Sequence, residues 1–362
     1  MTKALLVLPY LAPYRVDIIN ALADKYQLTV LFLYPFVPEQ RFEQDRMLQQ
    51  LKAEVVFLQQ GFQLFGRPFR FGVIDLVNRF QPDVIFANEF NSVSLILSMM
   101  RFLRRKCFRL VLTTSDNAEM ARTASLARRI ARRLVLWQCQ IAIVYGEEVA
   151  EWYRDTYPGL EVRVCPNIQD SARLRALDLD VFEAAARLRA EFGFLEAKVV
   201  LYVGRLATVK ALDLLIKAFS ELERPDNNWR LVVVGDGPEK TRLQEEVRWL
   251  NLTAEVFFVG RFEAEELYAW YAAADLFVLP SKFEPFGAVV NEALVWGCPC
   301  VVSSAAGAAE YIVEGKNGVI FQSGSLDSLM LALSNVADNI ERSRQSLMVK
   351  SFKQYLGAYD GF

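Results

Sequence analysis

Short apolar runs and amphipathic segments alternate along most of the chain. In its first half the runs have strand length, and the segments between them repeat their apolar positions with helical spacing. Fully apolar strands that alternate with helices are typical of parallel sheets covered on both faces. The predicted strands of this half are 4–8, 28–34, 54–58, 82–87, 109–115 and 139–146, and the predicted helices are 16–26, 71–80, 95–105, 118–137 and 147–157.

A second alternation of the same kind follows a polar stretch. Residues 168–180 (IQDSARLRALDLD) are rich in charged residues and are interpreted as the connection between two domains. The sequence therefore predicts two successive α/β domains with a cleft between them. The strands predicted after the connection are 199–204, 229–235, 256–260 and 276–280, and the helices are 207–222, 238–250 and 265–274.

The composition is that of a folded protein with large cores. Of the 362 residues, 53% are hydrophobic and 23% are charged, which argues against disorder and fits about two domains. The five cysteines are expected to be reduced packing residues, because their odd number and irregular spacing do not form a disulfide framework. Cys298 and Cys300 have no second pair, so we expect no metal there. These features predict a cytoplasmic protein, and no apolar run reaches the length that spans a bilayer.

The charge is nearly balanced overall and uneven locally. A net charge of −2 argues against a nucleic-acid-binding protein. The region 101–133 is basic, with Asp116 and Glu119 as its two acids, and it predicts contact with the inner face of an anionic membrane. The alternative is ordinary core packing with a solvated basic face. The ten basic positions are 101, 104, 105, 106, 109, 122, 128, 129, 132 and 133.

The sequence contains no histidine. Catalytic triads, Cys–His pairs, His-ligated zinc and imidazole bases are therefore excluded. Any proton transfer must use a carboxylate, a substrate oxygen or water.

The segment 281–321 carries the most informative motif. Glu284-Pro285-Phe286-Gly287 precedes the apolar run 288–297, so we expect Glu284 in a loop before a helix and Glu292 inside that helix. The N–H groups at a helix N-terminus suit a phosphate, and ionised carboxylates accept hydrogen bonds from sugar hydroxyls. This combination predicts a site for a sugar joined to phosphates. The alternative is that Glu284 is a loop acid and Glu292 a solvated helix residue.

Two further turns follow predicted strands. Gly204-Arg205-Leu206 comes directly after a strand, and Lys210 opens the next helix, so both cations are expected at the carboxyl end of a parallel sheet. An Arg and a Lys there would neutralise a diphosphate; the alternative is two solvated surface cations. Gly235-Asp236-Gly237-Pro238 follows a second strand. It lacks the further residues of a dinucleotide or P-loop motif, and a plain tight turn explains it equally well.

Residues 281–312 resemble the donor-site motif of retaining GT-B glycosyltransferases, specifically glycosyltransferase family 4. The family pattern is E-P-F-G-x4-E, then A-x-x-x-G-x-P-V and a Gly-Ala or Gly-Gly turn before a Glu. Residues 203–219 (VGRLATVKALDLLIKAF) are similar to the family's G-R-L-x3-K-G motif, with Ala211 where glycine is usual. The resemblance is strong from about Val199 onward and weak before Asp83.

The resemblance implies an α/β GT-B fold, in which two Rossmann-like parallel-sheet domains face each other across a cleft. The acceptor-side domain would comprise 1–168 together with a C-terminal helix, 346–362, that crosses back to it. The donor domain would comprise 169–345.

The family's donor-site roles transfer to matching positions of this chain. Arg205 and Lys210 match the cations that hold the donor diphosphate. Glu284 matches the acid that contacts the transferred sugar, and Glu292 matches the acid that holds the ribose. The other matched donor-side positions are Phe286, Gly287, Ala288, Val289, Gly204, Gly235 and Gly237.

The first domain departs from the family pattern. The strand 109–115 aligns with one that usually ends in a His, and here Ser115-Asp116-Asn117 follows, so Asp116 is the candidate that shapes the sugar pocket or orients the acceptor hydroxyl. The usual glycine-rich loop after the first strand is replaced by residues 9–15. The remaining acceptor-side candidates are Tyr14, Arg15, Glu89, Asn91, Ser115 and Asn117, of which Glu89 and Asn91 are equally well explained as loop residues.

These features together predict a retaining glycosyltransferase that uses a nucleotide-diphosphate sugar and a hydroxyl acceptor, a glycolipid or growing surface polysaccharide. No metal or other cofactor is expected. Asp178-Leu179-Asp180 matches a D-x-D metal motif but lies before a predicted helix, where Asp is common as a cap. The alternatives are a nucleotide-sugar epimerase of the same fold and a non-catalytic nucleotide-sugar binding protein.

Overall fold

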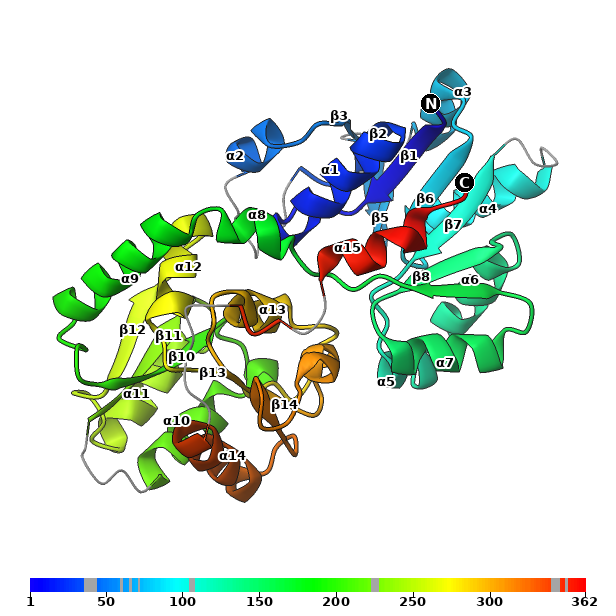
Figure 1. Ribbon diagram of the computed structural model, residues 1–362. Coiled ribbons are helices and arrows are strands. Elements are labelled where there is room, and N and C mark those ends of the chain that lie inside the picture. The colour runs from blue at the N-terminus through cyan, green and yellow to red at the C-terminus, as the bar shows by residue number, and fades with distance from the viewer. Residues whose placement is uncertain are drawn as a thin grey trace. The chain divides into compact units, whose positions relative to one another are not determined.

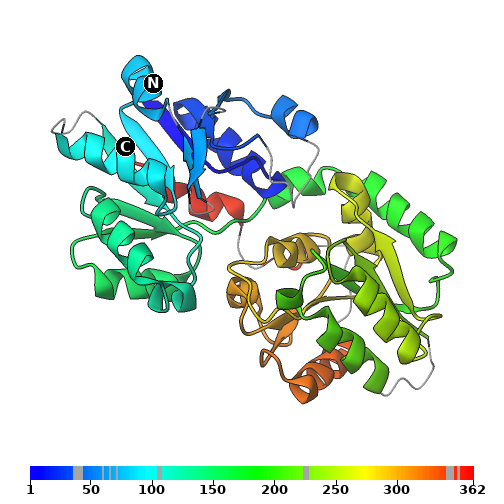
Figure 2. The same ribbon diagram turned by 180° about the vertical axis from the view of Figure 1, so that it is seen from behind.

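The chain folds into two compact α/β units in a computed structural model (Figure 1). The structure describes residues 1–35, 44–58, 61–64, 67–70, 72–103, 108–222, 228–339, 346–348 and 351–362. One unit consists of Met1–Gln169 and Lys353–Phe362, and the other of Asp170–Phe352. Helices lie on both faces of each main sheet, as the opposite view in Figure 2 also shows.

The first unit is built on a seven-stranded parallel sheet of order β3-β2-β1-β6-β7-β8-β9. Its strands are β1 (Lys3–Leu8), β2 (Gln27–Phe32), β3 (Glu54–Phe57), β6 (Val84–Asn88), β7 (Arg109–Thr113), β8 (Ile141–Val144) and β9 (Glu161–Val164). The helices between them are α1 (Val16–Lys25), α2 (Gln44–Gln49), α3 (Val73–Phe80), α4 (Ser92–Leu103), α5 (Ala118–Arg122), α6 (Leu126–Leu136) and α7 (Glu147–Thr156). A separate antiparallel pair is formed by β4 (Gly61–Leu64) and β5 (Arg67–Arg70).

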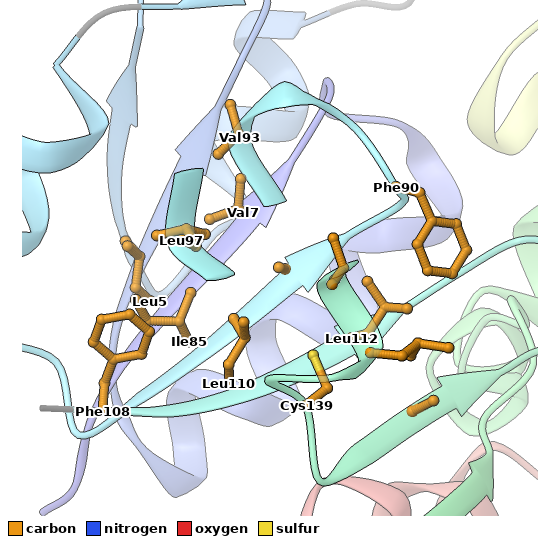
Figure 3. Packing of buried hydrophobic residues seen from close by; sticks show 14 of the residues in the cluster. Leu5, Val7, Ile85, Phe90, Val93, Leu97, Phe108, Leu110, Leu112 and Cys139 are labelled. Carbon is orange, nitrogen blue, oxygen red and sulfur yellow. The ribbon is translucent and has the colours of Figure 1, made fainter. Parts of the chain in front are cut away.

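The sheet of the first unit separates two hydrophobic cores. Successive residues of a strand point to opposite faces, so Leu5 and Val7 enter one core while Leu6 and Leu8 enter the other. Figure 3 shows the first of these cores, where Val93 and Leu97 of α4 pack over β1 and β6. This two-sided burial explains why the strands are apolar throughout.

The C-terminal segment completes the second core of this unit. It forms α15 (Phe352–Tyr355) and a 3₁₀ turn, η4 (Leu356–Tyr359). The rings of Tyr359 and Phe362 contact Phe86, and the Tyr26 hydroxyl donates to the Tyr359 carbonyl at 2.6 Å. The segment is shorter than the helix predicted over 346–362, because the described helical turns begin only at Phe352; residues 349–350 lie outside the described part.

The second unit contains a six-stranded parallel sheet of order β12-β11-β10-β13-β14-β15. Its strands are β10 (Lys198–Val203), β11 (Trp229–Val234), β12 (Val256–Gly260), β13 (Leu276–Leu279), β14 (Cys300–Ser303) and β15 (Gly318–Phe321). Its helical elements are α8 (Ser171–Arg175), α9 (Asp178–Glu191), η2 (Thr208–Lys210), α10 (Leu212–Glu221), α11 (Lys240–Trp249), α12 (Ala264–Ala273), α13 (Ala288–Val295), η3 (Gly307–Tyr311) and α14 (Leu326–Asn339).

Two further local predictions differ from the structure in detail, although the boundary between the units, after Gln169, lies within the predicted connection. The single helix predicted over 118–137 is two helices, because Ser125 starts a new one by accepting a hydrogen bond from the Arg128 amide at 3.3 Å. The polar connection 168–180 contains α8 and the first turn of α9. Its helical character was missed because its polar and charged residues were taken as a sign of a loop.

The described cysteines are buried free thiols. They are Cys139, Cys165, Cys298 and Cys300, and burial raises the pKa of the Cys139 and Cys165 thiols to about 12. Cys107 lies outside the described residues. Within the described helices, none combines the length and the hydropathy needed to cross a bilayer.

Candidate functional site

The turns after β10 and β11 are joined backbone to backbone. The Gly204 amide donates to the Val234 carbonyl at 3.0 Å, and the Leu206 amide donates to the Asp236 carbonyl at 2.9 Å. A Cβ on Gly235 would lie 1.9 Å from the Gly204 carbonyl oxygen, so only glycine permits this approach. The glycines of the G-D-G-P motif are therefore explained by close packing of this turn against the turn that contains Arg205.

Lys210 is held at the same edge of the sheet by a short 3₁₀ turn. The turn η2 ends at Lys210, and Ala211 then takes a left-handed conformation with φ 49° before α10 begins. This conformation explains why the related motif usually has glycine at the position of Ala211. The Lys282 amide donates to the Val209 carbonyl at 2.9 Å, which ties this turn to the loop before Glu284.

The loop that contains Glu284 is fixed by a second chain segment. The Gly307 amide donates to the Glu284 carbonyl at 3.1 Å, and the Ala308 amide donates to the Phe286 carbonyl at 2.6 Å. A Cβ on Gly307 would lie 2.4 Å from the Pro285 carbonyl oxygen. The Gly-Ala turn after β14 thus serves as a backbone clamp for the Glu284 loop.

Lys210 and Glu284 form an ion pair, although they are 74 positions apart in the sequence. Their side chains are 23% and 13% exposed, so the pair is largely shielded and still reachable from solvent. Burial, together with the charge of Glu284, also raises the pKa of the nearby Tyr202 hydroxyl, which donates to the Arg205 carbonyl at 3.0 Å. The folded unit therefore brings the two strongest sequence motifs into one site.

Gly287 marks the change from the Glu284 loop to α13. Its φ of 98° lies in the left-handed region, and the helix begins at the next residue. The amides of Ala288 and Val289 are in the first turn, where N–H groups have no acceptor within the helix. The site therefore combines an anion-binding helix terminus with the Lys210–Glu284 pair.

A substitution at Gly287 tests this geometry. A Cβ there would lie 2.9 Å from Leu279 Cδ2 and 3.2 Å from Glu284 Cγ, so Gly287→Ala should displace Glu284 and weaken nucleotide-sugar binding at least tenfold. Gly315→Ala is the matched control, because Gly315 has φ 72° and nothing within 4 Å of its added Cβ. Calorimetric titration of both variants separates backbone strain, which they share, from displacement of Glu284. Equal affinity in the two variants would contradict this account.

Glu292 lies on α13 one turn beyond these amides. The side chain is buried, and the Tyr271 hydroxyl donates to its Oε2 at 3.0 Å. Burial and the neighbouring Glu292 carboxylate raise the pKa of Tyr271 well above its ordinary value, so this phenol stays a donor. Tyr271 was not predicted from the sequence, because in the run EELYAWYAAA it looks like any other buried aromatic of a helix.

Arg205, the other predicted cation, lies in the turn after β10 and is exposed. Its place at the carboxyl end of the central strand agrees with the predicted edge of the sheet. The second unit thus gathers Gly204, Arg205, Lys210, Gly235, Gly237, Glu284, Phe286, Gly287, Ala288, Val289 and Glu292 around the carboxyl ends of β10, β11 and β13.

The predicted acceptor-side residues of the first unit form a different kind of cluster. Glu89 follows β6 in a left-handed conformation with φ 63°, and its carboxylate accepts from the Ser115 amide and hydroxyl at 2.7 Å each. Thr114 and Arg128 donate to the same carboxylate at 3.2 and 3.0 Å. These bonds fix the loops after β6 and β7 against each other.

Asp116 is not placed to touch a substrate. Its side chain is fully buried and accepts from Arg132 at 3.1 Å, from Arg128 at 2.5 Å and from the Tyr153 hydroxyl at 2.8 Å. Burial and the Asp116 charge raise the pKa of Tyr153. The carboxylate holds two arginines of α6 and a tyrosine of α7 inside the unit, which favours a structural role; the catalytic role of Asp116 stays a prediction.

Two predicted asparagines also have structural roles. Asn117 is the N-cap of α5 and accepts from the Met120 amide at 2.8 Å. Asn91 accepts from the Ser94 amide at 3.0 Å and donates to the Asn88 carbonyl at 2.8 Å. The S-D-N run after β7 and the N-x-x-S spacing before α4 are helix-start signals that the functional interpretation overlooked.

Tyr14 and Arg15 line a small pocket of the first unit. Asn88, Thr113 and Tyr145 at the carboxyl ends of β6, β7 and β8 line the same pocket. Arg15 is 9% exposed, donates to the Tyr10 carbonyl at 2.7 Å and lies 4.9 Å from the Tyr10 ring centroid. Burial raises the pKa of Tyr145 to about 12. The replaced loop after β1 thus contributes a buried cation to this edge of the sheet.

The described residues contain no cluster of side chains that could bind a metal ion. No group of three or more His, Cys, Asp or Glu residues lies close enough there to hold an ion. Asp178 of the D-x-D sequence pairs with Arg175 at 2.9 Å in the first turn of α9.

Comparison with known proteins finds a related family for part of the chain. Residues 186–347 match the sequence profile described as "Glycosyl transferases group 1". This part of the chain is similar to the members of that family. The matched range contains the Lys210–Glu284 pair and all of α13.

Two curated relatives each match less than half of the chain. A GDP-mannose-dependent α-(1-6)-phosphatidylinositol monomannoside mannosyltransferase from Mycolicibacterium smegmatis is 32% identical over 168 residues, which is 44% of this chain and 44% of the relative. A mannosylfructose-phosphate synthase from Agrobacterium fabrum is 41% identical over 140 residues, which is 36% of this chain and 31% of the relative. The matched stretches span less than half the length of these relatives.

Solved structures match almost the whole chain. The Anabaena protein HepE in complex with UDP superposes with a TM-score of 0.72 at 21% identity, covering 93% of this chain and 90% of the other. A sucrose-phosphate synthase from Thermosynechococcus elongatus gives 0.70 at 19% identity, covering 99% and 94%. These similarities confirm the predicted fold class, two Rossmann-like parallel-sheet α/β domains of GT-B type.

Proposed function

We propose that this protein is a retaining glycosyltransferase that moves a sugar from a nucleotide-diphosphate sugar to a hydroxyl acceptor. The observation that carries the proposal is the Lys210–Glu284 pair in front of the α13 N-terminus. A cation and helix amides suit a diphosphate, and a carboxylate beside them suits the hydroxyls of the sugar attached to it. The family match over 186–347 and the names of its relatives support the same reaction class.

Different residues would bind different parts of the donor: the diphosphate, the transferred sugar and the ribose. Lys210 and Arg205 would hold the diphosphate, together with the amides of Ala288 and Val289. Glu284 would accept from hydroxyls of the transferred sugar. Glu292, oriented by the Tyr271 hydroxyl, would accept from the ribose. The cations have their largest effect as the sugar leaves, because negative charge then accumulates on the diphosphate.

The proposed proton path uses no side-chain base. The chain has no histidine, and Asp116 is fully buried and bonded to two arginines. The acceptor hydroxyl would attack from the face that the phosphate leaves, and a phosphate oxygen would take its proton. That geometry retains the anomeric configuration, and it requires no metal.

The acceptor is proposed to be a glycolipid or a growing surface polysaccharide at the cytoplasmic face of a membrane. The M. smegmatis relative is named for a phosphatidylinositol monomannoside, which is a lipid-linked sugar. The basic region 101–133 supports contact with an anionic surface.

A ligand screen tests the donor half of the proposal. The purified protein would be melted with UDP, GDP, ADP, dTDP or CMP and their common sugars, each with EDTA and with magnesium. A ligand that binds only the native state raises the melting temperature with the logarithm of its saturation. We expect one nucleotide diphosphate to stabilise the protein equally in EDTA, and Glu292→Ala to lose most of the shift. Stabilisation that requires magnesium would contradict the metal-free mechanism, and no stabilisation by any nucleotide would contradict the donor site.

The nucleotide sugar identified in this screen can then be used to distinguish transfer from the alternative functions. A transferase releases nucleoside diphosphate and passes the sugar to an acceptor, an epimerase returns a nucleotide sugar of altered configuration, and a binding protein returns the donor unchanged. Chromatography of the donor after incubation with membrane extract distinguishes these outcomes.

A further inference from the structure

Helix α6 turns two arginines toward the interior of the unit and leaves an apolar stripe exposed. Arg128 and Arg132 point into the unit, where both bond to the buried Asp116 carboxylate. Val135 and Leu136 also pack inward, but three other apolar residues of the helix point outward: Leu126 is 71% exposed, Ile130 51% and Leu134 50%. Leu126, Ile130 and Leu134 therefore do not take part in the core packing that was the alternative for this basic region. Asp116 and Glu89 favour this orientation of the arginines, because a buried guanidinium needs an acidic partner.

The end of α4 extends this apolar surface. Met99, Phe102 and Leu103 are exposed on its last turns, and the Phe102 ring lies 5.3 Å from the ring of Trp137, which follows α6. The Ser98 hydroxyl donates to the Leu134 carbonyl at 2.9 Å, so the two helices are joined (Figure 1). We define the α4–α6 face as Met99, Phe102, Leu103, Leu126, Ile130, Leu134 and Trp137, with the exposed Arg129 and Arg133.

The charge of this face is of one sign. Neither α4 (SVSLILSMMRFL) nor α6 (LARRIARRLVL) contains an acidic residue. Arg129 and Arg133 are three and seven positions after Leu126, so they flank the apolar stripe on the helix surface. An exposed apolar surface bordered by arginines complements the apolar interior and anionic headgroups of a bilayer.

We propose that the α4–α6 face docks on an anionic lipid surface. Leu126, Ile130, Leu134 and Trp137 enter the boundary between headgroups and acyl chains, where an indole is well accommodated. Arg129 and Arg133 bind the lipid phosphates. The inference is independent of the donor site, because every residue of the face belongs to the first unit.

Vesicle flotation of the full chain tests the proposal. Vesicles of phosphatidylglycerol and phosphatidylcholine in equal parts would be compared with phosphatidylcholine alone. We expect wild type to float with the anionic vesicles and to bind the neutral ones at least tenfold more weakly. Trp137→Ala and Arg133→Glu should each lower the partition coefficient at least fivefold.

The second unit supplies matched controls. Trp249 is 81% exposed on α11 and Arg248 precedes it, so Trp249→Ala and Arg248→Glu remove the same chemistry from another face. Both controls should bind vesicles as wild type does. Nucleotide-induced stabilisation, measured on all four variants, should be unchanged, which separates lipid binding from donor binding.

Three outcomes would overturn the proposal. These are failure of wild type to bind anionic vesicles, equal loss in the control variants, and dissociation of an oligomer by Trp137→Ala in size-exclusion chromatography without an effect on flotation. The last result would assign the α4–α6 face to a second copy of the chain.

Discussion

Lys210→Ala is expected to lower kcat/KM for sugar transfer by about a hundred- to a thousandfold while the protein stays folded. The ammonium group is placed beside Glu284 at the carboxyl edge of the sheet, where the proposed diphosphate would gain charge as it leaves. Removing it also leaves the Glu284 carboxylate without the ion-pair partner that the structure shows. That unpaired negative charge would then repel the diphosphate, so binding and turnover both decrease.

Release of nucleoside diphosphate from the donor identified by the ligand screen provides the measurement. Lys217→Ala is the matched control, because Lys217 is an exposed lysine of α10 whose contact with Glu221 spans 3.9 Å. The control should keep wild-type kinetics, since exposed pairs of this kind contribute little. Wild-type turnover in Lys210→Ala would show that the Lys210–Glu284 pair is not part of the reaction site.

Asp116→Asn is expected to lower the free energy of unfolding by about 3–5 kcal/mol, the cost of breaking a buried ion pair from one side. The substitution keeps the size of the side chain and removes the charge that compensates Arg132, whose side chain is 1% exposed. Arg128 loses one of its two acidic partners at the same time.

Urea unfolding followed by circular dichroism and by tryptophan fluorescence measures this effect. Trp152 is a local reporter, since its ring lies 5.0 Å from the Arg132 guanidinium. Glu148→Gln is the control, because Glu148 pairs with Arg122 at the surface and its loss should change stability little. If Asp116→Asn unfolds like wild type but loses transfer, the carboxylate acts in the reaction and the structural assignment is wrong.

The cluster of residues proposed as the donor site was largely predictable, because these residues lie in two short local motifs. Glu284, Gly287 and Glu292 fall within nine positions, and Arg205 and Lys210 within six. A strand-to-helix turn fixes which side chains appear at the carboxyl edge of a parallel sheet, so local spacing carries the chemistry. Tyr271 was missed because its contact with Glu292 links different helices, and nothing in its own segment distinguishes it.

In the first unit, local spacing did not predict the role of polar residues at strand ends. Asp116, Asn91 and Asn117 are polar residues next to strand ends, which is the pattern that suggested a site. Whether such a residue faces a ligand or a neighbouring helix depends on which helix packs beside it. Arg128 and Arg132 reach Asp116 from α6, and that contact settled the matter.

The sequence by itself determined the alternation of apolar strands and helices, hence two parallel α/β sheets, and the cation and carboxylate motifs of the donor side. These depend on period and local spacing, which the linear order contains. The tertiary structure alone decided that Lys210 meets Glu284, that Asp116 is buried and that the apolar stripe of α6 faces outward. A helical pattern defines two faces but does not say which of them packs inward. In α6 the acidic residues of other elements bind the arginines and so determine which face is buried.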